Sequence, residues 1–135
     1  MALKLSNLES FDPSEIEKLR SCGISTTDDV VRQAASRESR RRLAKHAGVA
    51  EASLLRLARA ADLLRIAGIN EAHTRLLDAL GAGCVEDLRL QDAAVLIKAM
   101  RRKNVELTLV RSVPPESNLA RWIADANAVP IVLET

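Results

Sequence analysis

Apolar side chains recur at every third or fourth position along most of the chain, a spacing that predicts amphipathic helices. The clearest start is at Asp12, which can cap a helix that has Pro13 at its first position. The longest helical stretch is expected over 51–66, and Gly68 ends it. Further helices are expected after Thr26, Ser36, Asn70 and Pro115, and over 85–89 and 92–103. The pattern predicts an all-α fold of about eight short helices packed as one compact domain.

One segment departs from the helical spacing. Val105, Leu107 and Leu109 alternate with more polar neighbours, which is the period of a strand. Because no strand partner is evident in the sequence, we expect 104–113 to form an extended connector that lies on the helices. The apolar tail Ile131-Val132-Leu133 is expected to pack as well.

The chain also repeats itself. After a shift of 58 residues, Leu19 falls on Leu77 and Gly23 falls on Gly81. Further along the offset grows to 65, and one insertion of seven residues explains the change. We therefore expect two helix-hairpin-helix-like units, residues 5–64 and 65–130, packed as a single domain.

Short turns of the form apolar-Gly-apolar-polar join several of these helices, centred on Gly23, Gly48 and Gly68. In nucleic-acid-binding hairpins of this form, the free N–H groups of the next helix face a phosphate oxygen. Such hairpins usually have a second glycine two positions later, where this chain has Ser25, Ala50 and Asn70. Asn tolerates a positive φ, so the best candidate is the turn Gly68-Ile69-Asn70, which Arg65 and Arg75 flank.

Three segments carry a resemblance to a known family: Leu64-Arg65-Ile66-Ala67-Gly68-Ile69-Asn70, Leu76-Leu77-Asp78-Ala79-Leu80-Gly81 and Val85-Glu86-Asp87-Leu88. Together with 110–114 and 122–126, they are similar to the domain of unknown function 4332 family. The resemblance runs from about Leu5 to Val129. It implies tandem helix-hairpin-helix-like units of mostly bacterial origin, and it implies no function because the family is uncharacterised.

Charge is concentrated in one region of the chain. The formal net charge is only +2, but residues 32–65 contain nine Lys or Arg and three Asp or Glu. On a helix, Arg37, Arg41 and Lys45 form one stripe, and Arg42 lies beside it. This stripe fits a phosphate-contacting face. Taken alone, it is more typical of a solvated helix face that balances the acidic first residues of the chain.

The residues that carry catalysis or bind metal ions are scattered. His46 and His73 lie in different units, and neither has a metal-ligand spacing to a cysteine or carboxylate. Cys22 fits a core position, and Cys84 has no histidine partner nearby in the sequence. The acidic pairs at 28–29 and 86–87 fit the first turns of helices. We therefore expect no enzyme activity, no cofactor and no metal site.

Two binding hypotheses follow. The leading one is a non-catalytic module that binds the DNA or RNA backbone in a duplex without reading its sequence, through Arg37, Arg41, Arg42, Lys45, Arg65, Gly68, Ile69, Asn70 and Arg75. The alternative is a protein-interaction or scaffolding module of a larger bacterial assembly, with 105–110 and the apolar tail facing the partner. Only Phe11 and Trp122 are aromatic, which argues against base stacking.

No signal peptide or membrane-spanning stretch is evident, so no membrane partner and a cytoplasmic location are expected.

Overall fold

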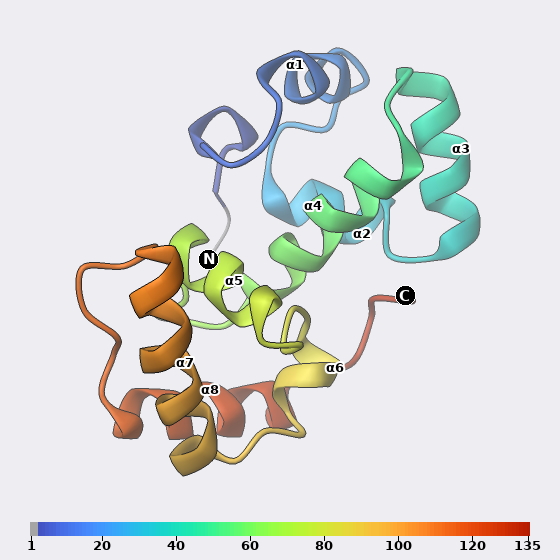
Figure 1. Ribbon diagram of the computed structural model, residues 1–135. Coiled ribbons are helices and arrows are strands. Elements are labelled where there is room, and N and C mark those ends of the chain that lie inside the picture. Colours follow the sequence, from blue (N-terminus) through green and yellow to red (C-terminus); the bar gives the residue numbers. More distant parts are fainter. Residues whose placement is uncertain (1–2) are drawn as a thin grey trace. The chain divides into compact units, whose positions relative to one another are not determined.

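The chain folds into helices, as the hydrophobic spacing predicts (Figure 1). The computed structural model describes residues 3–135, and within this range it contains no strand. A 3-10 helix, η1 (Leu5–Asn7), precedes eight α-helices: α1 (Pro13–Ser21), α2 (Thr27–Gln33), α3 (Arg37–Ala47), α4 (Glu51–Leu63), α5 (Glu71–Ala79), α6 (Val85–Leu88), α7 (Ala93–Leu107) and α8 (Glu116–Ala128). The all-α prediction is confirmed.

Contacts divide the chain into two compact units. The first contains the described residues up to Asp62 together with Val132–Thr135, and the second is Leu63–Ile131. The helices follow the same order in both units. After a shift of 58 residues the bounds of α1 coincide with those of α5, and after a shift of 65 those of α4 coincide with those of α8. The other two pairs differ in length, because α2 has 7 residues and α6 has 4, whereas α3 has 11 and α7 has 15.

The first unit begins with a segment that pairs with the turn before α2. The Leu5 N–H donates to the Ser25 carbonyl at 2.9 Å, and the Thr27 N–H donates to the Leu3 carbonyl at 2.9 Å. Thr26 starts α2 through a capping box with Asp29, in which side chains and backbone N–H groups bond reciprocally. The buried side chains beneath these elements are mainly aliphatic: Leu5, Ile16, Leu19, Ile24, Val30, Leu54 and Leu57.

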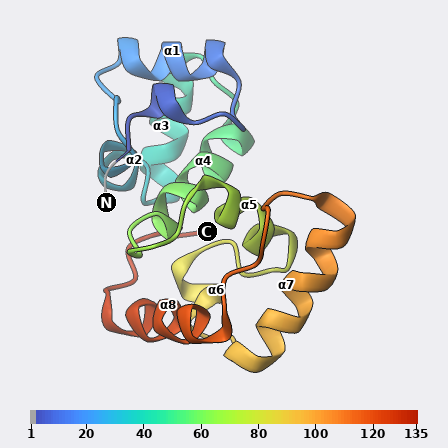
Figure 2. The same cartoon turned by 90° about the vertical axis from the view of Figure 1, so that its left-hand side faces the viewer.

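The second unit is built around Trp122, which is 1% exposed on α8. Helix α7 packs against both α5 and α8, and α6 packs against α8 (Figure 2). Arg89 follows α6, and its Nη2 donates to the carbonyls of Ala126 and Val129, each at 2.8 Å. Because the last carbonyls of a helix have no partner within it, these bonds satisfy the end of α8.

The expectation of an extended connector over 104–113 is wrong for its first part. Helix α7 continues to Leu107, and Thr108 ends it with a φ of +50°. The Asn104 side chain accepts the N–H groups of Leu109 and Val110, at 2.9 Å and 3.0 Å, and so fixes the turn that follows. The apolar residues of this alternation do not form a buried strand face, because Val105 and Leu107 are 83% and 44% exposed.

None of the helices in the described range is both long enough and apolar enough to cross a bilayer.

Candidate nucleic-acid interface

The basic stripe lies on α3, whose ends are fixed by polar groups. Ser36 caps the first turn, where its hydroxyl accepts the Ser39 N–H at 3.1 Å. Gly48 ends the helix with a φ of +76°, a conformation that costs glycine little. Between these ends the structure exposes all four cations that the sequence assigned to this face: Arg37, Arg41, Arg42 and Lys45.

The exposed cations differ in their partners. Arg41 Nε lies 3.7 Å from Glu51 Oε1, and both side chains are mostly exposed, so this pair contributes little stability. Arg42 and Lys45 have no ion-pair partner among residues 3–135. These two cations are therefore available to an external anion.

Arg40 also lies on α3, next to Arg41 in the sequence, but it has a different role that was not predicted. It is only 5% exposed, and its Nη1 donates to the carbonyls of Ala34 and Ala35 at 3.0 Å and 2.8 Å. These bonds join α3 to the end of α2. Burial lowers the pKa of Arg40, although an arginine stays charged at neutral pH. The signal in the sequence is its spacing of four from the buried Ala44, which places both on the inner side of the helix.

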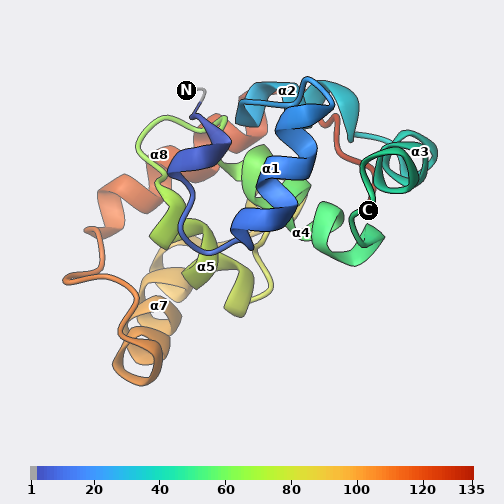
Figure 3. The ribbon, with the colours of Figure 1, turned by 90° about the horizontal axis from the view of Figure 1, so that it is seen from above.

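A groove lies beside the basic stripe, between α3 and α4. It has a volume of about 280 Å³ and is lined by Arg37, Arg40, Arg41, Glu51, Ala52, Leu55 and Thr135. The C-terminal segment of the chain ends beside α3 (Figure 3), where Arg37 Nε donates to the Thr135 backbone oxygen at 2.9 Å. Two arginines of the basic stripe, Arg37 and Arg41, therefore line this groove together with the buried Arg40.

The Gly68 turn lies in the second unit, and its geometry differs from the one expected for a phosphate loop. Gly68 has a φ of +92°, and a Cβ placed there would lie 3.1 Å from Trp122 Nε1, so a glycine is required. The Ile69 N–H donates to the Ile66 carbonyl at 3.2 Å, and the Asn70 N–H donates to His73 Nδ1 at 3.1 Å. Of the three residues assigned to a phosphate contact, Ile69 and Asn70 thus already have partners for their N–H groups inside the protein.

Asn70 starts α5 as an N-cap, with φ at −108° rather than in the left-handed region. Its Oδ1 accepts the His73 N–H at 2.9 Å, which completes a capping box. Of the flanking arginines, Arg75 is exposed, whereas Arg65 donates from Nη2 to the Pro130 carbonyl at 3.1 Å. The predicted residues thus fall into two groups, of which one belongs to the first unit and the other to the second.

His73 also contacts the single tryptophan. The ring centroids of His73 and Trp122 lie 4.9 Å apart, with an interplanar angle of 51°. Burial lowers the pKa of His73, and the nearby Gly68 carbonyl partly offsets this effect. Sequence spacing does not indicate the contact between His73 and Trp122, which lie 49 residues apart.

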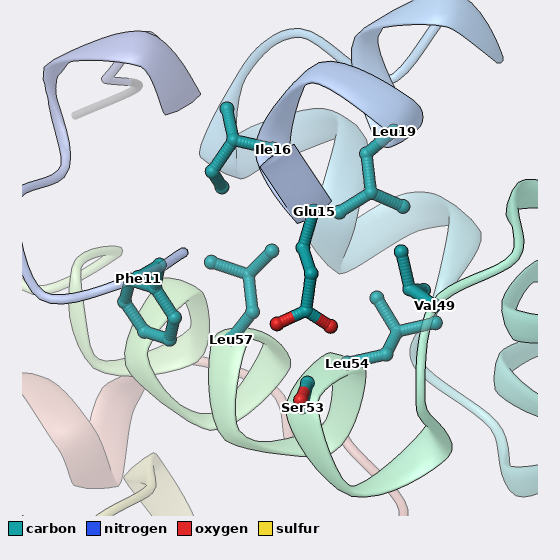
Figure 4. A pocket seen from close by; sticks show the side chains of 8 residues that line it. All are labelled: Phe11, Glu15, Ile16, Leu19, Val49, Ser53, Leu54 and Leu57. Atoms are coloured by element: carbon teal, nitrogen blue, oxygen red, sulfur yellow. The ribbon is translucent and has the colours of Figure 1, made fainter. Parts of the chain in front are cut away.

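An apolar pocket lies between α1 and α4 (Figure 4), and its polar groups are those of Glu15 and Ser53. The remaining lining side chains are Phe11, Ile16, Leu19, Val49, Leu54 and Leu57. Arg56 lies over the Phe11 ring, with Cζ 4.4 Å from the centroid. The pocket has a volume of only about 10 Å³, close to the minimum that a single water molecule needs. The pocket is best explained as a packing feature of the first unit.

Among the described residues, no group of three or more histidine, cysteine or carboxylate side chains is placed to hold a metal ion. Cys84 is buried and donates from Sγ to Asp87 Oδ2 at 3.2 Å. Cys22 is half-buried rather than fully in the core.

The chain belongs to the family described as "Domain of unknown function (DUF4332)", whose model matches residues 9–129. No curated protein matches the chain. No solved structure matches it either.

Proposed function

We propose that this member of the domain of unknown function 4332 family is a non-catalytic module that binds the phosphate backbone of duplex nucleic acid through α3. The observation that carries the proposal is the exposed set Arg41, Arg42 and Lys45 on one helix, of which the last two have no ion-pair partner in the described part of the chain. Cations that are neither buried nor paired are free to replace the counterions of a phosphate backbone.

The dimensions of α3 suit such a backbone. From Arg37 to Lys45 the helix rises about 12 Å, at about 1.5 Å per residue. One strand of a duplex advances about 3.4 Å per phosphate, so this length matches about three to four phosphates. The stripe therefore supports a few simultaneous contacts to phosphates.

The proposed binding is independent of sequence. Reading base edges needs side chains that enter a groove and form bidentate hydrogen bonds, and the cations of α3 form a single stripe instead. The hairpin turn at Gly68-Ile69-Asn70 keeps only a secondary place, because the N–H groups of Ile69 and Asn70 have internal partners. The proposed setting is the cytoplasm of a bacterial cell, where such a module meets DNA or RNA.

The test is binding of the full chain to labelled duplex DNA and duplex RNA over a salt series, with Arg41→Glu/Arg42→Glu as the variant. A matched control is Arg101→Glu/Arg102→Glu, which changes the same charge at exposed positions of α7. We expect the α3 variant to weaken binding about tenfold or more at low salt and to reduce the salt slope by about two. The assignment of α3 is wrong if both double variants bind as tightly as each other.

A second candidate function is binding of a protein partner, and exposed apolar side chains favour it. Leu90, Val95 and Val105 are 78%, 66% and 83% exposed, before and along α7. Single exposed apolar residues are common on soluble proteins, so this observation carries less weight than the cation stripe. If neither duplex binds at low salt, the next variant to test is Val95→Lys/Val105→Lys. Its readout is the loss of a larger assembly in size-exclusion chromatography.

A further inference from the structure

An anionic side chain of the protein itself already occupies the start of α3. Glu134 Oε1 accepts the N–H of Arg37, the first residue of the helix, at 2.9 Å. The Glu134 N–H donates to the Ala35 carbonyl at 2.8 Å. Leu133 is buried, and together these contacts fix Val132–Thr135 against the first unit.

The place that Glu134 occupies has the properties of an anion site. The N–H groups at a helix start are positively polarised, and here Arg37 adds its guanidinium, which contacts Thr135. The adjoining groove of about 280 Å³ is lined by Arg37, Arg40 and Arg41. Arg40 is nine-tenths buried and held by two carbonyls, so its charge has a fixed position.

The carboxylates near this groove only partly neutralise it. Glu51 lines the groove and pairs with Arg41 at 3.7 Å, and Glu134 is the other acid that acts on Arg40. Three arginines and a helix start thus face these two carboxylates and the backbone oxygen of Thr135. One of these carboxylates, Glu134, lies in Val132–Thr135, a segment that belongs to no helix.

We propose that the start of α3 and the adjoining Arg37–Arg40–Arg41 groove form a phosphate site, and that Glu134 occupies the start of α3 as a competing anion when no ligand is bound. Release of Val132–Thr135 then exposes the start of α3 to a phosphate group. This inference rests on the proposed function where the phosphate is that of a nucleic acid backbone, whereas a free phosphate compound is the other source of the same chemistry.

The experiment compares the full chain with Glu134→Gln, in which the amide oxygen can still accept the Arg37 N–H but the charge is lost. The matched control is Glu38→Gln, which removes the same charge from an exposed position of α3. Each protein is titrated with pyrophosphate at low salt, and the NMR shifts of the Arg37 backbone and Nε–H signals are followed. We expect Glu134→Gln to bind pyrophosphate about threefold or more tightly than the wild type, and Glu38→Gln less than twofold.

The same three proteins are then titrated with duplex DNA. Tighter binding of both pyrophosphate and duplex by Glu134→Gln supports the inference and places it on the nucleic acid backbone. Tighter pyrophosphate binding with no duplex binding by any form supports the anion site and overturns the proposed function. The inference itself is overturned if pyrophosphate binds no form, or if it binds Glu134→Gln no more tightly than Glu38→Gln.

Discussion

The third helix of each unit is stabilised in a different way. Helix α7 buries Leu96, Ile97 and Met100, whereas the residues that α3 buries are Arg40 and Ala44. Each aliphatic side chain of α7 contributes about 1.5–3 kcal/mol by leaving water. Helix α3 obtains little from this source and depends instead on caps and on the hydrogen bonds of Arg40. A helix held by polar contacts leaves nearly all of its outer surface free for charge, which is the property that the proposed function uses.

The ends of the same two helices differ as well. Gly48 ends α3 with a φ of +76°, and Thr108 ends α7 with a φ of +50°. A β-branched residue in this region is strained, and Asn104 compensates by holding the carbonyl and N–H groups of the next turn. The two units thus end their third helix with different residues, a glycine in the first unit and a threonine in the second.

Arg40→Met gives the largest expected effect on this comparison. Methionine fills much of the same space, but the carbonyls of Ala34 and Ala35 lose a charged donor. We expect a loss of about 2 kcal/mol in the free energy of unfolding, measured by urea denaturation followed by circular dichroism. Arg42→Met is the control, because Arg42 is exposed and without an ion-pair partner in the described range. Equal stability of the two variants would show that Arg40 does not hold α3 in place.

Exchanging the helix-ending residues gives a smaller effect of opposite sign in the two units. Gly48→Thr is expected to destabilise by about 1 kcal/mol, because the space around Gly48 is open and only the positive φ opposes a side chain. Thr108→Gly is expected to stabilise by up to about 1 kcal/mol, since it removes the same strain. Urea midpoints measure both changes. A destabilised Thr108→Gly would mean that the threonine side chain contributes more than its backbone strain costs.

The smallest effect expected is a pH dependence that comes from the second unit. The folded-state pKa of His73 is lowered by burial, so neutral His73 contributes stability above pH 6.5. That contribution is lost as the pH falls through the folded-state pKa. Between pH 7.5 and 5, the wild type should therefore lose more stability than His73→Gln, in which Gln can complete the capping box without titrating.

Trp122 fluorescence follows this change in urea titrations, because the two rings are in contact. His46→Gln is the control, since His46 is exposed on α3. A wild type and His73→Gln with parallel pH profiles would contradict the assigned role of His73.

Local signals in the sequence predicted much of this fold. Helices were expected to start after Asp12, Ser36 and Asn70, and in the structure each of these residues caps a helix by accepting a backbone N–H. These predictions succeed because a cap involves residues two or three positions apart. The extent of α7 was missed because apolar and polar side chains alternate at its exposed end, which is a pattern typical of a strand.

The candidate site was predicted less completely. The exposed cations of α3 follow from helical spacing alone. The docking of Glu134 on Arg37 joins residues 97 positions apart, and no local pattern indicates it. The internal partners of the Ile69 and Asn70 N–H groups depend on His73 and on the path of the preceding turn, which sequence spacing does not define.

The central claim is that α3 presents free cations to a phosphate backbone, and the salt dependence of duplex binding by the wild-type chain tests it most directly. The account predicts an affinity that falls linearly with salt on a log–log plot, with a slope of about −3 from three to four phosphate contacts. Absence of binding to either duplex at low salt, or binding that salt does not weaken, would contradict it.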